Sequence, residues 1–279
     1  MERLPHRLTS DGIELATWTW PGARPQFLLV HGLASNARLW DEVADHLATA
    51  GYGVHSVDLR GHGRSDRPSA GYDFATLTTD LSEVIRQLGI APVVAIGQSF
   101  GGNLCLELAA IEPHLVSSLA LIDGGFIDLS VTFPDWAAAE AALTPPPLPL
   151  VDFASATRQA EARFQGFSAR GVAAQLANLE PDGDGRIRRR LPLSAHLEIL
   201  RHLYQHRPLQ RAPSVTQPVL IVAADNQDSS DKQQRVGALV AALPQAEAHW
   251  IAGHHDLHAQ QPETVAKLII QAVERGFLR

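Results

Sequence analysis

The sequence alternates between short apolar runs and longer amphipathic segments, and it loses this alternation in only one stretch. Several of the runs are almost wholly apolar, as strands buried on both faces must be. Strands are predicted at residues 13–20, 27–30, 54–58, 93–97, 119–122, 219–223 and 248–251. Helices are predicted at residues 39–50, 74–88, 100–111, 232–243 and 262–275. This order predicts an α/β fold: a mostly parallel sheet flanked by helices, in which the first hairpin is the place for an antiparallel pair.

The alternation fails from about Phe126 to Arg211. Ala-rich helical stretches there are broken by Thr144-Pro145-Pro146-Pro147-Leu148-Pro149 and by Pro181-Asp182-Gly183-Asp184-Gly185. We therefore expect a core of residues 1–125 and 212–279 with a helical cap inserted at residues 126–211. Ligands bind at the carboxyl ends of parallel strands, so a cap that leaves one strand end would cover that edge and restrict the substrate.

The strongest local motif is Gly97-Gln98-Ser99-Phe100-Gly101, between an apolar strand and a helix. Small residues on both sides of a serine allow the tight strand-to-helix turn that exposes its hydroxyl group as a nucleophile. A second motif, His31-Gly32-Leu33, directly follows a predicted strand. The backbone N–H groups of Leu33 and Phe100 are therefore the candidate oxyanion donors, whereas His31 is expected to be a buried structural residue.

A serine hydroxyl needs an imidazole base within hydrogen-bond reach. The segment Gly253-His254-His255-Asp256-Leu257-His258 follows the last predicted strand and offers three histidines. Such a cluster can bind zinc, but a serine nucleophile needs no metal, so we expect neither a metal nor a cofactor.

With these motifs the chain resembles the α/β-hydrolase superfamily, in particular its capped serine hydrolases, from Leu28 to about Ile270. The resemblance includes the segment from Asp58 to Ser65, whose role in the family is structural, and the tail from His255 to Glu263. In the family the catalytic histidine stands seven residues before the proline of that tail, which selects His255. The family also implies an acid, and two positions fit: Asp228, after a one-residue insertion, and Asp123, where some capped members carry it. The resemblance does not decide between them.

This reading implies a Ser-His-Asp hydrolase that cleaves a small carboxylic ester or lactone through an acyl-enzyme. A carbon–carbon bond hydrolase of the meta-cleavage type and a hydrolase-like small-molecule receptor remain alternatives, since fold does not separate them. The dehalogenases and epoxide hydrolases of this fold have an aspartate where Ser99 stands, so their reactions are disfavoured.

Charge and cysteine content exclude further classes of function. A net charge of −7 argues against nucleic-acid binding. The basic run at residues 186–190 is either a solvated helix face or turn, or an anion or partner contact; in a carbon–carbon hydrolase it would meet a carboxylate. A lone cysteine, Cys105, forms no intramolecular disulfide. The sequence also lacks a signal peptide and a membrane span, so we expect a cytoplasmic protein, monomeric or homodimeric, that acts on a small-molecule substrate.

Five aromatic residues of the expected cap are either pocket-lining or packing residues: Trp136, Phe153, Phe164, Phe167 and Tyr204. Aromatic side chains in helical segments are commonly packed against one another. The sequence therefore does not identify the residues that select the substrate.

Overall fold

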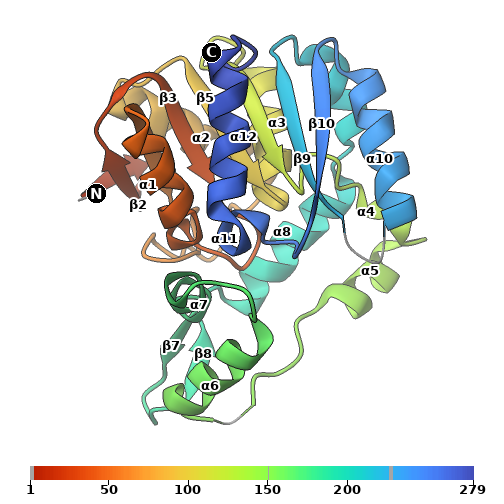
Figure 1. Cartoon of the computed structure of the whole chain (residues 1–279). Helices are drawn as coiled ribbons and strands as arrows, with labels where there is room; N and C mark the ends of the chain where they lie inside the picture. Colours follow the sequence, from red (N-terminus) through yellow and green to blue (C-terminus); the bar gives the residue numbers. More distant parts are fainter. Residues whose placement is uncertain (1–2, 150, 226–228) are drawn as a thin grey trace.

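The computed structural model describes residues 3–149, 151–225 and 229–279. Within these residues, eight strands form one sheet in the order β1-β2-β4-β3-β5-β6-β9-β10 (Figure 1). The strands of the sheet are β1 Leu4–Ser10, β2 Ile13–Trp20, β3 Ala23–Val30, β4 Tyr52–Val57, β5 Val93–Gln98, β6 Val116–Ile122, β9 Val219–Asp225 and β10 Ala246–Ala252. The pairs β1·β2 and β2·β4 are antiparallel, and the other neighbouring strands are parallel. The predicted fold class is thus confirmed.

Helices cover both faces of the sheet (Figure 1). One face packs against α1 Asp41–Thr49 and α12 Pro262–Glu274. The other packs against α2 Phe74–Leu88, α3 Phe100–Ile111 and α10 Ser229–Ala242. Alternate residues of the same central strand, such as Leu28 and Leu29, enter opposite core layers, because successive side chains of a strand point to opposite faces. This explains why the central strands are apolar throughout.

All of the predicted strands and helices are present, and the prediction missed β1. Residues of β1 alternate between exposed and partly buried positions at the edge of the sheet, so the sequence there has no apolar run to reveal a strand. The predicted helix at 39–50 is a short 3₁₀ turn, η1 Ala37–Trp40, followed by α1. The side chain of Asn36 accepts the N–H of Arg38 at the start of this turn, as N-cap residues do.

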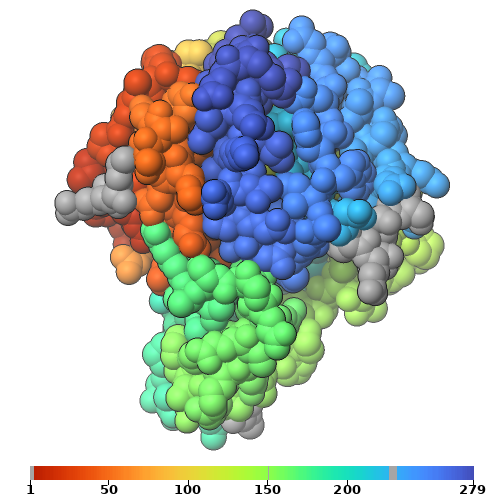
Figure 2. Space-filling view, viewed as in Figure 1, coloured from red at the N-terminus to blue at the C-terminus, as the bar shows by residue number. Residues whose placement is uncertain are grey.

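The segment between β6 and β9 protrudes from the carboxyl edge of the sheet (Figures 1 and 2). It contains α4 Leu129–Thr132, α5 Trp136–Leu143, α6 Phe153–Arg163, α7 Ala169–Leu176, α8 Leu193–Gln205, α9 Pro208–Arg211 and the short 3₁₀ helix η2 Ala212–Ser214. The predicted helical insertion is therefore present, but it also holds an unpredicted antiparallel hairpin of β7 Leu179–Pro181 and β8 Ile187–Arg189. The cap boundaries at 126 and 211 stay a prediction.

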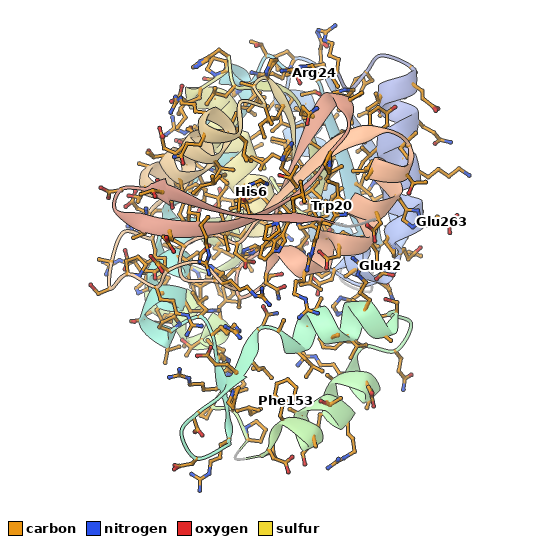
Figure 3. All side chains as sticks on the ribbon, turned by 90° about the vertical axis from the view of Figure 1, so that its left-hand side faces the viewer. His6, Trp20, Arg24, Glu42, Phe153 and Glu263 are labelled. Carbon is orange, nitrogen blue, oxygen red and sulfur yellow. The ribbon has the colours of Figure 1, made fainter. Side chains whose placement is uncertain are left out.

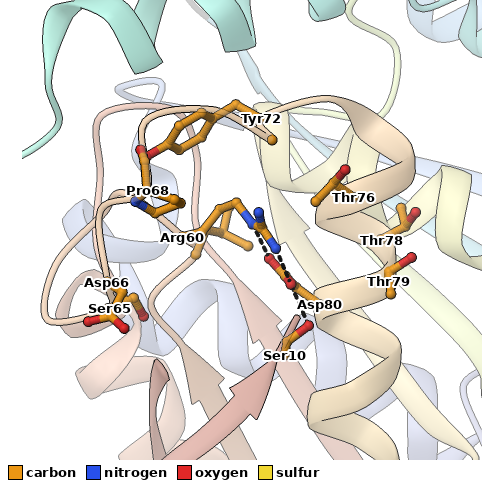
Figure 4. A network of polar contacts seen from close by, with 12 residues as sticks. Ser10, Arg60, Ser65, Asp66, Pro68, Tyr72, Thr76, Thr78, Thr79 and Asp80 are labelled. Atoms are coloured by element: carbon orange, nitrogen blue, oxygen red, sulfur yellow. Dashed lines mark hydrogen bonds and ion pairs between the residues drawn. The ribbon is translucent and has the colours of Figure 1, made fainter. Parts of the chain in front are cut away.

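Buried polar contacts hold the loop after β4 against the sheet (Figure 4). Arg60 binds Asp80 of α2 through two hydrogen bonds of 2.6 and 2.7 Å, and Ser10 Oγ donates to the same carboxylate at 2.6 Å. All three side chains are buried. Removing one partner of a buried ion pair is strongly destabilising. The pair therefore anchors Arg60 at the start of the loop that continues toward Ser65. Among the described residues, no helix is both long and apolar enough to cross a membrane.

Candidate active site

Ser99 lies at the turn between β5 and α3. Its backbone has φ +53° and ψ −123°, a strained conformation for a residue with a side chain, of the kind that concentrates at functional sites. Its N–H donates to the carbonyl of Ile122 on the neighbouring strand β6 at 3.0 Å. A Cβ atom at Gly97 would lie 2.3 Å from the carbonyl oxygen of Gly101, and one at Gly101 would lie 2.5 Å from that of Val30. The two glycines are thus required for the tight turn.

The loop after β3 passes beside this turn. A Cβ atom at Gly32 would lie 3.2 Å from Ser99 Cβ, so the chain that carries Leu33 runs next to the serine. Within the described part of the chain, the N–H groups of Leu33 and Phe100 have no protein acceptor. Both are therefore available to a ligand at Ser99.

Two buried histidines hold this loop in place. His31 Nε2 accepts the N–H of Leu59 at 3.0 Å, and its Nδ1 donates to the carbonyl of Gly32 at 2.7 Å. His62 Nε2 accepts the N–H of Ala34 at 3.2 Å, and its Nδ1 donates to the carbonyl of Arg60. Burial lowers the pKa of His31 well below its usual value and that of His62 to about 4. Both imidazole rings are therefore neutral at neutral pH, and their hydrogen bonds hold the loop in place.

The three histidines of the C-terminal segment have different surroundings. His255 Nδ1 lies 2.6 Å from Asp123 Oδ2, and 46% of the His255 side chain is exposed. His254 lies beside the rings of Phe164 and Phe167, whereas His258 is buried against Trp40. His255 is thus the histidine of the three that contacts Asp123.

Asp123 follows β6, and its side chain is 1% exposed. Its Oδ1 accepts the N–H of Ala224 at 3.0 Å. Burial raises the pKa of Asp123, but the hydrogen bond and charge of His255 and the charge of Lys232 lower it by more, so its pKa lies below the usual value. The carboxylate is therefore ionised at neutral pH. The alternative acid, Asp228, lies outside the described residues.

The ionised Asp123 in turn changes His255. Burial lowers the pKa of His255, whereas the hydrogen bond to Asp123 and the charges of Asp123 and Asp256 raise it by more, so the net shift is upward. Donation from Nδ1–H to the carboxylate leaves Nε2 as the free, basic nitrogen. Among the described residues, no hydrogen bond joins Ser99 to His255; such contacts are often long before a substrate binds.

A buried lysine at Asp123 was missed by the sequence analysis. Lys232 Nζ lies 3.1 Å from Asp123 Oδ1 and donates to the carbonyl of Ala224 at 3.0 Å. Lys232 lies four residues before the buried Val236 on α10, and residues at this spacing share one face of a helix. The feature of the sequence that could have indicated this contact is a lysine on an otherwise apolar face of a predicted helix.

A second unpredicted contact links the insertion to the histidine loop. Gln175 of α7 donates from Nε2 to Asp256 Oδ2 at 2.7 Å. Gln98, the residue before Ser99, donates to Asp256 Oδ1 at 3.3 Å and to the carbonyl of His255 at 3.2 Å. Asp256 thus joins the serine turn, the histidine loop and the insertion. Sequence reasoning had no signal for it, since the three residues come from separate segments.

The basic run at residues 186–190 is not a helix face, because its residues Ile187–Arg189 form strand β8. Arg188 and Arg190 pair with Glu180 at 2.8 and 3.1 Å. Arg189 donates to the carbonyl of Pro146. Arg188, Arg189 and Arg190 therefore have protein partners, and contact of the run with a substrate carboxylate stays a prediction.

Four of the five aromatic residues considered above form two groups, and Phe153 belongs to neither. Trp136 packs edge to face with Tyr204. Phe164 and Phe167 pack against each other and His254, the neighbour of His255. The second group therefore lies next to the candidate site. In the described part of the chain, no cluster of three or more His, Cys, Asp or Glu side chains has metal-binding geometry.

Comparisons with known proteins agree with this architecture. The family profile of the alpha/beta hydrolase fold matches residues 25–262. An uncharacterised protein of Mycobacterium tuberculosis is 34% identical over 114 residues, which are 40% of this chain and 33% of that protein. The chain thus spans about a third of the length of the first curated relatives it matches.

Solved structures resemble the chain over nearly its whole length. E-2-(acetamidomethylene)succinate hydrolase superposes with a TM-score of 0.83 at 24% identity, covering 98% of this chain and 100% of that one. An esterase from Exiguobacterium antarcticum superposes with a TM-score of 0.73 at 18% identity, covering 97% and 100%. At these identities the likeness shows the fold alone.

Proposed function

Because this chain belongs to the alpha/beta hydrolase fold family, we propose that it is a serine hydrolase that cleaves a small carboxylic ester or lactone through Ser99, His255 and Asp123. The observation that carries the proposal is the 2.6 Å contact between His255 Nδ1 and Asp123 Oδ2. A carboxylate on Nδ1 holds the imidazole in the tautomer that leaves Nε2 free to accept a proton.

The proposed reaction begins with a proton transfer from Ser99 Oγ to His255 Nε2 as Oγ attacks the carbonyl carbon of the substrate. The carbonyl oxygen becomes an oxyanion that accepts the N–H groups of Leu33 and Phe100, each worth about 3 kcal/mol in the transition state. The intermediate collapses, the C–O bond breaks, and His255 returns the proton to the leaving alkoxide. Water activated by His255 then hydrolyses the acyl-enzyme and restores Ser99.

The ionised state of Asp123 supports this role. An imidazolium forms on His255 in each half of the reaction, and a buried carboxylate beside it stabilises that charge. The esterase with this fold is named for the proposed activity, and the fold also carries an enol-lactonase from Burkholderia xenovorans. Both names are consistent with acyl transfer to a serine, and the substrate of this chain is a proposal from chemistry alone.

The test is a panel of p-nitrophenyl esters of rising chain length and several lactones, assayed with the intact protein and with Ser99→Ala, Asp123→Asn and Asp228→Asn. We expect Ser99→Ala to abolish turnover and Asp123→Asn to lower kcat by about 10⁴-fold. Asp228→Asn, the matched control for the acid, should retain activity within a few-fold.

Two outcomes would contradict the proposal. Loss of activity in Asp228→Asn together with retention in Asp123→Asn would assign the acid to Asp228. If the folded protein hydrolyses none of the esters or lactones, the assignment to ester chemistry fails, and a carbon–carbon hydrolase or a receptor becomes the better interpretation. Labelling by a serine-directed fluorophosphonate, absent in Ser99→Ala, would separate the last two because it requires a reactive serine.

A further inference from the structure

A cavity of about 410 Å³ lies where the insertion meets the core, and Ser99, Leu33 and His255 are not among its lining residues. The core contributes residues of β2, η1 and the loop after β4, and the insertion contributes residues of α6, α7 and the β7–β8 hairpin. Figure 3 shows this side of the molecule, with Phe153 of α6 on the insertion below the core. The volume suits a small organic ligand.

Four arginines line this cavity: Arg3, Arg38, Arg64 and Arg190. We call it the arginine cavity. Two of the four are paired with carboxylates, Arg3 with Asp41 and Arg190 with Glu180. In the described part of the chain, the guanidinium groups of Arg38 and Arg64 have no hydrogen bond or ion pair with a side chain. The cavity therefore contains two guanidinium groups whose donors are free for a ligand.

Among the described residues that line the cavity, the one carboxylate is that of Asp58, and each of its oxygens accepts a backbone N–H group. Its Oδ1 accepts the N–H of Ala37 and its Oδ2 accepts the N–H of Arg64, both at 2.7 Å. Its carboxylate is therefore turned to the backbone of the two loops. Arg3 and Arg190 are balanced by Asp41 and Glu180, so the charges of Arg38 and Arg64 face the single charge of Asp58 and leave an excess of positive charge at the wall.

The arginines also repel one another. Burial lowers the pKa of Arg3, the charge of Asp41 raises it, and the charges of Arg38, Arg170 and Arg64 lower it again, with a net downward shift. An anion between these groups would relieve the repulsion, and guanidinium groups bind carboxylates and phosphates in a bidentate geometry. The apolar wall is formed by Trp18, Phe153 and Leu176.

We propose that the arginine cavity binds a small organic anion, with its carboxylate or phosphate group on Arg38 and Arg64 and its apolar part against Trp18, Phe153 and Leu176. The site is distinct from Ser99 and lies at the boundary of core and insertion. A ligand there would therefore hold the insertion against the core. Phosphates and carboxylates share this chemistry, and the experiment separates them.

The experiment is isothermal titration calorimetry at low ionic strength in a Ser99→Ala background, which prevents turnover and makes the result independent of the proposed hydrolysis. The probes are phenyl phosphate, phenylacetate, inorganic phosphate and the neutral 2-phenylethanol. We expect an aromatic anion to bind and 2-phenylethanol to bind at least about tenfold more weakly. Tighter binding of phenyl phosphate would identify a phosphate ligand, and tighter binding of phenylacetate a carboxylate ligand.

The variant Arg38→Gln/Arg64→Gln should raise the Kd of the preferred anion by about tenfold or more, because each lost charge-assisted contact is worth about a factor of ten. The matched control is Arg24→Gln/Arg201→Gln, which removes the same charge from exposed residues outside the cavity; Arg24 lies at the end of the core opposite to the insertion (Figure 3). Thermal melts confirm that both variants are folded. The absence of anion binding, or equal Kd values in the two double variants, would overturn the proposal.

Discussion

Lys232 Nζ lies 3.1 Å from Asp123 Oδ1, and the other oxygen of the same carboxylate lies 2.6 Å from His255 Nδ1. The one buried carboxylate of Asp123 thus contacts both an ammonium group and an imidazole. The two neighbouring charges shift the pKa of His255 in opposite directions: the carboxylate of Asp123 raises it, and the positive charge of Lys232 lowers it. Single substitutions of these neighbours should therefore raise or lower the pKa of His255, depending on which charge is removed.

Lys232→Met removes the charge that lowers the pKa of His255. His255 must be neutral to accept a proton, so kcat/KM falls as the pH drops through its pKa. We expect the acid limb of the kcat/KM profile to move to higher pH, by about half a unit to one unit. The control is the other lysine, Lys267→Met, which is exposed on α12. An unchanged or downward-shifted limb in Lys232→Met would contradict the electrostatic role.

Asp256→Asn should have the opposite effect. Asp256 raises the pKa of His255 through its charge, and asparagine keeps the shape while removing that charge. The acid limb of kcat/KM should therefore move to lower pH, by about half a unit. Asp184→Asn, in the turn between β7 and β8, is the control of equal net charge. The prediction fails if the two asparagine variants give the same profile.

Glu180→Gln tests the contact between the β7–β8 hairpin and the core. Glu180 pairs with Arg67 of the core loop and with Arg188 and Arg190, and its hydrogen bond to Arg67, with the charges of the arginines, lowers its pKa to about 2. Because the pKa of Glu180 is lower in the folded state than its unfolded value of 4.5, its ionised form stabilises the folded state at pH values above 4.5. That stability is lost as the pH falls through the folded pKa.

We expect Glu180→Gln to lower the free energy of unfolding by about 2 kcal/mol at pH 7, after allowance for solvent screening. The difference from the intact protein should shrink as the pH falls from 4.5 towards 2. Urea unfolding at pH 7 and pH 3.5 measures both values, and Glu274→Gln on the exposed side of α12 is the control. An equal difference at the two pH values would refute the ionic origin.

Gly101→Ala tests the packing of the serine turn on the loop of Leu33. The added Cβ atom would lie 2.5 Å from the carbonyl oxygens of Val30 and His31. Backbone atoms of a central strand cannot move aside, so we expect a loss of about 3 kcal/mol of unfolding free energy. Gly237→Ala, at a position in α10 with open space, should instead stabilise by about 0.5–1 kcal/mol. Chemical denaturation of both variants checks the pair, and equal effects would show that the close approach is not real.

The elements of the core could be predicted from the sequence because they depend on local patterns. Apolar runs predict buried strands, and the spacing of glycines around Ser99 predicts a tight turn. The edge strand β1 was not predicted because its residues are largely exposed and contain no apolar run. The β7–β8 hairpin was not predicted because its strands are short and β8 consists mostly of arginines, which give no apolar run. One of them, Arg189, donates to the carbonyl of Pro146, 43 positions away.

The sequence by itself determined that a serine stands at a strand-to-helix turn and that histidines follow the last strand, since both are features of contiguous residues. The resemblance of the tail selected His255 among them, and only the tertiary structure showed that His255 contacts Asp123, 132 positions away, with Lys232 on the same carboxylate. The physical reason is the strand order. Because β9 lies between β6 and β10, the residues that follow these strands converge at one edge of the sheet, and no local pattern of the sequence contains that order.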